Sequence, residues 1–360
     1  MDSLFRTLAK VPGALLIVPL FLAALINTVA PQVLEIGSFT TALFKDGAVP
    51  LIAMFFFVMG SQIRLGSVSS SLEKGVVMLV GKYVAAIVVG LSVAWLTPDG
   101  SLFGLVPLAI IAAMGNSNGA MYIALTGQFG NRSDKGAVAV LSINDGPLLT
   151  LIALGAAGLA DFSAMALLAV FLPILLGFTL GNTSDIAREF LAPGEKIILP
   201  FALFAIGAGI DLTVFATAGA VGFLLGIMTI VLSGGLAMLA LQVWHVARRH
   251  PKPTRNVIGG ACEATTAGNA IATPAAVALA DPSYQAVQGV ATTQVASAVV
   301  VTAVLIPFVV VAVSKWQARR GVSPEAEEAL YEERRAGRSP STEPDSEPEP
   351  GSASSTPAAT

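Results

Sequence analysis

Long apolar stretches separated by short polar segments extend over most of the chain. A helix needs about 20 predominantly apolar residues to cross the hydrocarbon core of a bilayer. The pattern predicts ten membrane-spanning helices, which cover residues 12–30, 48–65, 75–96, 102–129, 135–160, 163–182, 196–212, 217–244, 256–280 and 285–314. The fifth and sixth spans are separated near Asp161, where glycine and serine favour a turn. We therefore expect an all-α polytopic membrane protein.

The basic residues test this number of spans. With ten spans, all of the chain's 20 lysines and arginines except Lys45 fall on one side of the membrane. Lysine and arginine are enriched in cytoplasmic loops, so this distribution places both termini in the cytoplasm. One span more or fewer would scramble the alternation, and the bias therefore supports the count.

The composition agrees with a membrane protein and narrows the function classes. Charged residues make up 12% of the chain and the mean hydropathy is +0.77, whereas soluble domains average about 25% charged residues. The one cysteine, Cys262, excludes an internal disulfide framework, and His245 and His250 share one basic loop. We find no metal-ligand spacing, no phosphate-binding loop, no nucleophile with a paired base and no nucleic-acid surface. We therefore expect no enzyme, cofactor, metal or nucleic-acid partner.

The two halves of the membrane-embedded part resemble each other. Val18-Pro19-Leu20 in the first span matches Leu172-Pro173-Ile174 in the sixth, and Gly60 in the second matches Gly207 in the seventh. Because five is an odd number of spans, the second copy enters from the opposite face. The sequence thus predicts a five-plus-five inverted repeat, as in many secondary transporters. The alternative is chance, since proline and glycine are common in apolar helices.

The last 40 residues differ from the rest in composition. They contain nine acidic residues and three arginines and are rich in proline and serine. A short acidic helix is compatible with Pro324–Gly337, but the remainder cannot bury enough apolar surface to fold. We predict a disordered acidic cytoplasmic tail that the membrane-embedded part does not need. The predicted boundaries are 1–160 for the first repeat, 161–320 for the second and 321–360 for the tail.

The fourth and ninth spans are interrupted by small and polar residues. The interruptions are Met114-Gly115-Asn116-Ser117-Asn118-Gly119-Ala120 and Cys262-Glu263-Ala264-Thr265-Thr266-Ala267-Gly268-Asn269. Such residues favour local backbone bonding over the helix ladder. Paired broken helices at equivalent repeat positions indicate a substrate site at the membrane midplane, and half-helix N-termini suit a carboxylate. The alternative is close packing of small residues between helices.

Three ionisable residues lie inside the predicted spans, where charge is costly and marks functional candidates. Asp145 and Glu263 are candidate proton-coupling groups, and Lys82 is a candidate partner for an anionic substrate. The alternatives are that Asp145 caps a helix break at Gly146, and that Lys82 extends to the nearby cytoplasmic surface. The candidate substrate-binding residues are Gln62, Lys82, Asn116, Ser117, Asn118, Gly119, Tyr122, Thr265, Thr266, Asn269 and Thr273.

Several collinear segments match one known family. They include Ile17-Val18-Pro19-Leu20-Phe21-Leu22, Phe57-Val58-Met59-Gly60-Ser61-Gln62-Ile63, Asn118-Gly119-Ala120-Met121-Tyr122, Asp145-Gly146-Pro147-Leu148, Ile210-Asp211-Leu212-Thr213-Val214 and Ala272-Thr273-Pro274. Together they resemble the bacterial 2-keto-3-deoxygluconate permeases over nearly all of the membrane-embedded part. Two features depart from that family's pattern. Glu263 stands where a small, hydroxyl-rich run is expected, and the acidic tail is not a family feature.

The resemblance implies a bacterial inner-membrane symporter that imports 2-keto-3-deoxygluconate, a sugar-acid anion, with protons. It also implies kinship with the bile-acid/arsenite/riboflavin transporter superfamily, in which the broken fourth and ninth helices cross. In that architecture helices 1, 2, 6 and 7 form a panel, and the other helices form a core that moves against it. Sodium-coupled uptake of another organic anion is the alternative, with oxygen ligands from Glu263, Thr265 and Thr266. A receptor or an intramembrane enzyme is the third, disfavoured class.

Overall fold

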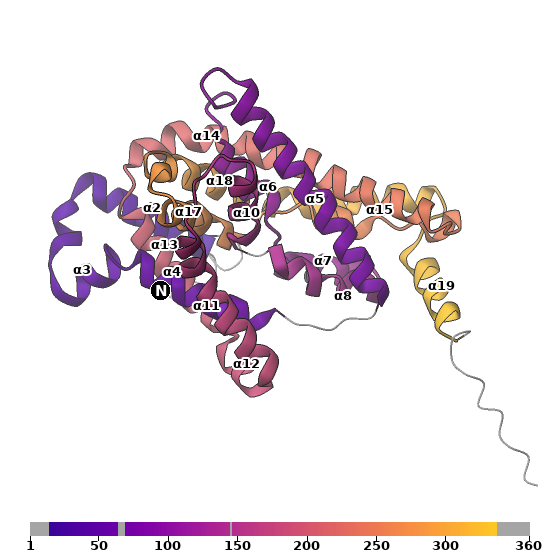
Figure 1. The fold of residues 1–360 in the computed structure, drawn as a ribbon. Coiled ribbons are helices and arrows are strands. Elements are labelled where there is room, and N and C mark those ends of the chain that lie inside the picture. The colour runs from indigo at the N-terminus through magenta and orange to yellow at the C-terminus, as the bar shows by residue number, and fades with distance from the viewer. Residues whose placement is uncertain (1–13, 64–68, 145, 337–360) are drawn as a thin grey trace, which may run out of the picture.

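The computed structural model describes residues 14–63, 69–144 and 146–336, and every named element in this part of the chain is a helix (Figure 1). The first half contains α2 (Ala14–Val29), η1 (Pro31–Glu35), α3 (Ser38–Phe44), α4 (Ala48–Gln62), α5 (Ser69–Leu96), α6 (Pro107–Gly115), α7 (Gly119–Phe129), α8 (Arg132–Gly136), α9 (Val138–Leu141), η2 (Ser142–Asn144) and α10 (Leu148–Ala156). The second half contains α11 (Ala164–Thr183), α12 (Asp185–Leu191), α13 (Gly194–Gly207), α14 (Leu212–Met228), η3 (Thr229–Gly234), α15 (Gly235–Ala247), η4 (Lys252–Thr254), α16 (Ile258–Cys262), η5 (Gly268–Ala272), α17 (Thr273–Ala280), η6 (Pro282–Tyr284), α18 (Gln285–Arg319) and α19 (Pro324–Ala336).

Several of these helices have the length and apolar character of membrane spans. Within the described residues, three helices are long enough individually, and counting four bent helix pairs raises the number to as many as seven. Three further apolar helices are shorter, with 10–17 residues. Each predicted span overlaps one of these elements, and α10 and α11 are separate on either side of Asp161. The all-helical fold is confirmed and fits a polytopic membrane protein, whereas ten full crossings and the inverted repeat stay predictions.

Four helices, α2, α4, α11 and α13, pack against one another, and we call them the panel. Glycines allow their backbones to approach closely, as is common between membrane helices. Gly60 of α4 lies against the backbone of Ile174 in α11, and Gly207 of α13 lies against the backbone of Leu20 in α2. A Cβ atom at either glycine would collide with the backbone of the facing helix.

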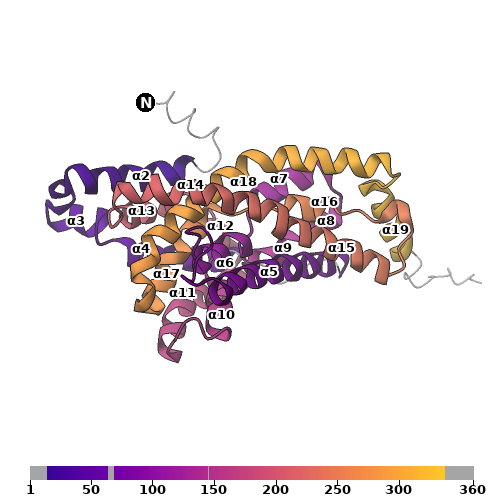
Figure 2. The same cartoon turned by 90° about the horizontal axis from the view of Figure 1, so that it is seen from above.

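The remaining long helices form what we call the core, which comprises α5 to α10 and α14 to α18. In the core, α14 packs along α18, and α5 packs against both α6 and α15. Figure 2 shows α5, α15 and α18 running along the length of the molecule. The segment η3 that joins α14 to α15 is a π-helix, and α6 is buried over nearly its whole length.

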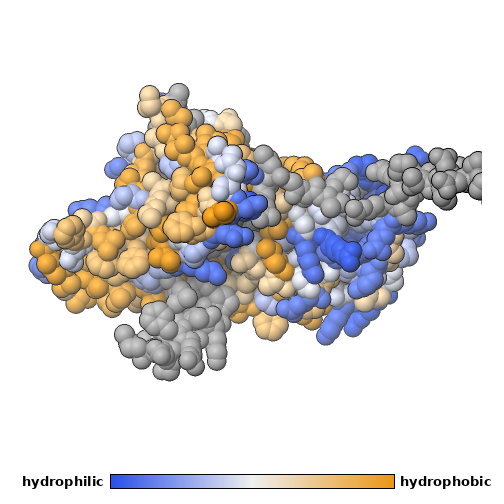
Figure 3. Space-filling model, turned by 90° about the horizontal axis from the view of Figure 1, so that it is seen from below, coloured by the Kyte–Doolittle hydropathy of each residue, from blue (hydrophilic) through white to orange (hydrophobic). Residues whose placement is uncertain are grey.

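The outer surface carries apolar stripes suited to lipid. Val76, Val80, Val84 and Val88 recur every four residues along α5, and 43% to 56% of each side chain is exposed. Residues at this spacing share one helix face. Hydrophobic residues cover much of the face shown in Figure 3, and most hydrophilic residues gather toward the end of the molecule where α19 lies. Such a surface favours a bilayer over water.

The C-terminal segment differs from the expected tail. The predicted short acidic helix is present as α19, and residues 337–360 lie outside the described part. The side chain of Glu327 in α19 is fully buried, so the segment 321–360 is not an unstructured extension over its whole length. From composition alone, a charge-rich segment is expected to be solvated, but here it packs against the end of the core that the basic residues predict to be cytoplasmic.

Candidate substrate site at the broken helices

Two helix breaks meet in the core. The first separates α6 from α7, and the second separates α16 from η5. The backbone N–H of Asn118 donates a hydrogen bond to the Thr265 hydroxyl (3.2 Å), and the Thr266 hydroxyl donates to the Ala113 carbonyl (2.9 Å). The breaks expected from the sequence are therefore present, and hydrogen bonds join them at a point that we call the crossing.

Lys82 of α5 reaches the second break and is fully buried there. Its ammonium group donates to the carbonyl oxygen of Glu263 (2.8 Å), to Glu263 Oε1 (3.1 Å) and to the carbonyl oxygen of Thr265 (2.7 Å). The hydroxyl of Ser117 in the first break donates to the same Glu263 carboxylate oxygen. One buried ion pair thus joins α5 to both breaks.

The π-helical segment η3 supports the crossing from another side. The Ser233 hydroxyl donates to the carbonyl of Met114 at the end of α6 (2.8 Å). Gly234 lies so close to Ala264 that a Cβ atom at Gly234 would collide with the alanine side chain. π-helical turns inside α-helices are frequent at functional sites. The sequence offers little signal for this support beyond a Ser-Gly pair inside an apolar span.

The first break also bonds to the segment that contains Asp145. Asn116 Nδ2 donates to the carbonyl of Gly146 (3.2 Å), and Asn144 Nδ2 donates to the Ser117 hydroxyl (3.4 Å). Asp145 itself lies outside the described residues. Its chain neighbours Asn144 and Gly146 both lie beside the first break. Asp145 therefore stays a candidate proton-coupling residue because of where its neighbours lie.

Two cavities lie between the panel and the core. One, of about 240 Å³, is lined by Asn118, Gly119, Asn269 and Glu195, together with apolar residues. Because α2 and α13 begin on this side, which the basic residues predict to be cytoplasmic, we call it the inner cavity. The other, of about 380 Å³, lies between α4, α13, α17 and α18 on the opposite side, and we call it the outer cavity.

Three sequence candidates lie away from the crossing. The Gln62 side chain donates to the carbonyl of Arg188 (3.1 Å) at the end of the panel. Tyr122 is fully buried, and its hydroxyl donates to the carbonyl of Asp134 (2.8 Å). Thr273 is buried at the start of α17. The candidates that the structure does place at the crossing or the inner cavity are Lys82, Asn116, Ser117, Asn118, Gly119, Glu263, Thr265, Thr266 and Asn269.

Glu195 is a cavity residue that the sequence pattern did not reveal. It lies in the first turn of α13, one residue before the predicted start of the seventh span. Its side chain is partly buried, and among the described residues that line the inner cavity it is the one acid. A charge at the edge of a span is typical of a solvated loop, which is why the pattern alone did not single it out.

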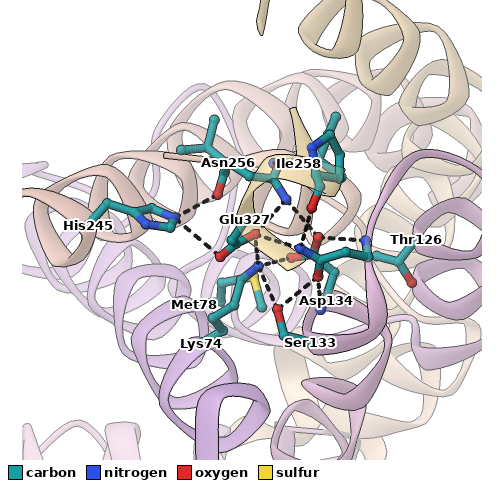
Figure 4. Close-up of polar contacts among 12 residues, drawn as sticks. Lys74, Met78, Thr126, Ser133, Asp134, His245, Asn256, Ile258 and Glu327 are labelled. Carbon is teal, nitrogen blue, oxygen red and sulfur yellow. Dashed lines mark hydrogen bonds and ion pairs between the residues drawn. The ribbon is translucent and has the colours of Figure 1, made fainter. Parts of the chain in front are cut away.

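A second buried polar cluster lies at the end of the core that the basic residues predict to be cytoplasmic (Figure 4). Glu327 Oε2 accepts hydrogen bonds from Lys74 Nζ (2.9 Å), Asn131 Nδ2 (2.8 Å) and Asn256 Nδ2 (3.0 Å). Lys74 also forms an ion pair with Asp134, and both side chains are fully buried. We call these five residues the cytoplasmic cluster. It ties α19 to α5, to α8 and to the segment that leads into α16.

The helix α19 makes a further contact beside this cluster. A guanidinium nitrogen of Arg334 lies 3.0 Å from His250 Nε2, and the Tyr331 ring meets the His250 ring edge-on at 6.1 Å between centroids. Burial, together with the nearby charges of Arg334 and Arg248, lowers the pKa of His250 to about 4. His250 is therefore neutral near pH 7 and packs as an uncharged ring.

The crossing provides groups for recognising a small polar anion. Its peptide groups, hydroxyls and amides supply donors and acceptors, and the N-terminal turn of α7 borders the inner cavity. The first N–H groups of a helix and its dipole attract negative charge. Within the described residues, no group of three or more His, Cys, Asp or Glu side chains is arranged to hold a metal ion.

Comparison with known proteins finds one family over most of the chain. A family model described as 2-keto-3-deoxygluconate permease matches residues 5–319. The 2-keto-3-deoxygluconate permease 1 of Salmonella typhimurium is 45% identical over 315 residues, which cover 88% of this chain and 96% of that protein. The 2-keto-3-deoxygluconate permease of Xanthomonas euvesicatoria pv. vesicatoria is 38% identical over 323 residues, 88% of this chain and 98% of the relative. That of Escherichia coli O7:K1 is 36% identical over 309 residues, 84% and 92% of the two chains.

Proposed function

Because the chain belongs to the 2-keto-3-deoxygluconate permease family, we propose that it imports 2-keto-3-deoxygluconate together with a proton. Family membership makes the protein a transporter and not an enzyme. The names of the relatives support the substrate. Proton coupling, a location in the bacterial inner membrane and two cytoplasmic termini belong to the proposal.

The observation that carries the proposal is the crossing of two broken helices between two cavities. Broken helices at membrane depth form the substrate sites of many secondary transporters. Asn118 and Asn269 face the inner cavity, where their amides suit the hydroxyl groups of a sugar acid. The N-terminal turn of α7 supplies a positive dipole end for the carboxylate of the substrate. Movement of the core against the panel would open each cavity in turn.

The arrangement at Lys82 favours a proton over sodium. A sodium site at the second break would require oxygens of Glu263 and Thr265 as ligands. In the structure, a carboxylate oxygen and two carbonyl oxygens of these residues already bind the ammonium group of Lys82. The resident ammonium group would compete with a sodium ion for these three oxygens.

Asp145 and Glu263 are the proposed proton-coupling groups. Glu263 forms a buried ion pair with Lys82, and we propose it as the partner of Asp145 in coupling. Asp145 lies between two residues that border the first break, and we propose it as the main coupling carboxylate. An anionic substrate nearby raises the proton affinity of a carboxylate, so the two ligands favour each other's binding.

Proteoliposomes test the proposal directly. With an acidic exterior and no sodium, the wild-type protein is expected to accumulate labelled 2-keto-3-deoxygluconate. Asp145→Asn mimics the protonated form, so it is expected to lose accumulation driven by the pH gradient while it still exchanges internal for external substrate. Accumulation that requires sodium and ignores the pH gradient contradicts proton symport. Accumulation by Asp145→Asn at the wild-type level removes Asp145 from the mechanism.

A further inference from the structure

The two cavities differ in charge. The outer cavity is lined by apolar residues, glycine, and the amides of Gln285 and Gln288, with no acidic or basic side chain among its described lining. The inner cavity adds a carboxylate, that of Glu195. The side from which a substrate enters and the side into which it leaves are therefore electrostatically unequal.

Among the described residues, Glu195 has no basic side chain beside it in the lining of the inner cavity. No lysine or arginine lines this cavity in the part of the chain that the structure describes. The elements packed against α13 are α2, α3, α4 and η5, and their sequences contain no ionisable residue. Lys196 follows Glu195 in the chain; it is exposed, and its positive charge attracts the Glu195 carboxylate from outside the cavity. On the core side, the charges of Lys82 and Glu263 cancel each other.

We propose that Glu195 controls substrate release into the cytoplasm by holding a proton while the anion occupies the inner cavity. This inference rests on the proposed function and adds a residue of the panel to it. A sugar-acid anion beside an ionised Glu195 puts two negative charges into a small, poorly screened space. A proton that forms an O–H bond with the Glu195 carboxylate removes the repulsion, so proton and anion bind together.

Release follows when this O–H bond breaks and the proton passes to the cytoplasm. The carboxylate is then ionised, so it repels the anion and opposes its rebinding from the cytoplasmic side. The outer cavity has no corresponding group among its described lining, so binding from outside is not subject to this repulsion. Glu195 is thus a release residue that favours discharge of the anion on the cytoplasmic side.

The test compares the pH dependence of substrate affinity on the two sides. Inside-out and right-side-out membrane vesicles containing the full chain exchange labelled 2-keto-3-deoxygluconate from about pH 5 to about pH 8. For the wild-type protein, the half-saturating concentration on the cytoplasmic side is expected to rise by about tenfold as Glu195 ionises. On the outer side, it is expected to rise far less.

Variants of Glu195 distinguish the effect of its charge on substrate affinity from the effect of its side-chain shape. Glu195→Gln keeps the shape without the titration, so its cytoplasmic half-saturating concentration is expected to stay at the low value that the wild type shows at acid pH. Glu195→Asp is expected to restore the pH dependence. Glu189→Gln, the same substitution at an exposed position of α12, is the matched control and is expected to behave as the wild type. Glu195→Ala is a second neutral variant should the glutamine variant fail to insert.

The possible failures are distinguishable. A Glu195→Gln or Glu195→Ala protein that retains the wild-type pH dependence overturns the role of Glu195 and leaves the proposed function intact. Wild-type vesicles that do not exchange the sugar acid at any pH overturn the proposed function instead.

Discussion

At the scale of single residues, the ion pair between Lys82 and Glu263 changes how each residue is interpreted. Each was a candidate from the sequence because charge at membrane depth is costly. Their partnership was not predictable, since 181 positions separate them and only the crossing brings them together. The alternative in which Lys82 extends to the cytoplasmic surface is wrong, because its side chain is fully buried and bonded to the second break.

The ion pair predicts a pattern of stability changes. Lys82→Met and Glu263→Gln are each expected to lower the free energy of unfolding by about 3–5 kcal/mol, because each leaves a buried charge without its partner. The double variant is expected to lose much less stability than the sum of the two single-variant losses. Unfolding of the purified protein in detergent measures all three. The control is Glu35→Gln, which removes the partly exposed pair with Lys45 and is expected to cost less than about 1 kcal/mol. Strictly additive losses contradict the pairing.

Other residues show what a division of the sequence into membrane spans does not reveal. Glu195 stands at the edge of a span and Glu327 in a charge-rich segment, and both positions are usually solvated. Glu195 lines a cavity because α13 packs beside η5, and Glu327 is buried because α19 docks on the core. These contacts are long-range, so no local pattern reports them. Asn131 and Asp134 carry a helix-capping signature, but capping does not disclose their bonds to α19 and α5.

At the scale of helices, one close contact between glycine and a facing backbone occurs twice in the panel. Gly60 of α4 meets Ile174 of α11, and Gly207 of α13 meets Leu20 of α2. These are the positions that the sequence comparison of the two halves matched to each other. An inverted repeat requires the contact between spans two and six to recur between spans seven and one, so this recurrence supports the predicted repeat.

The repeated contact predicts matched effects of substitution. Gly60→Ala and Gly207→Ala each add a Cβ atom that collides with a facing backbone, so each is expected to cost about 1–3 kcal/mol of stability and to reduce uptake. Gly127→Ala is the control, because a Cβ atom at Gly127 meets open space. Melting temperatures in detergent and uptake in vesicles measure the outcome. Panel glycines that tolerate alanine as Gly127 does would show that the close packing is unimportant.

The helix breaks were easier to predict from the sequence than the π-helical segment η3, where the chain stays helical. Clustered glycine, asparagine, serine and threonine marked both breaks, because these residues compete for backbone hydrogen bonds. The π-helical segment η3 has an apolar sequence with one Ser-Gly pair, so nothing in its composition indicates that it contacts both breaks. Its conformation depends on the crossing that it packs against.

At the scale of the whole molecule, the core is completed by a helix that lies beyond the family match. The match ends at residue 319, and α19 begins at Pro324. Glu327 from this helix accepts hydrogen bonds from residues of both halves of the core, including Lys74 and Asn256. The tail therefore divides into a docked helix and the acidic residues that follow it.

Two deletions distinguish these parts. Removing residues 337–360 keeps α19 and is expected to leave stability and uptake unchanged. Removing residues 322–360 also removes Glu327 and leaves its buried donors without an acceptor, so a loss of about 1–3 kcal/mol is expected. This replaces the expectation that the whole segment after residue 320 is dispensable. Thermal unfolding of both proteins measures the difference. Identical melting temperatures would show that α19 adds no stability.

The docked position of α19 has a consequence for how the protein is made. Every predicted span precedes Glu327 in the chain, so Lys74 lacks this partner until α19 has been synthesised. A chain that stops early, after Arg319, has every predicted span but no means of completing the cytoplasmic cluster. A full-length chain therefore carries a buried contact to Glu327 that a chain ending at Arg319 lacks.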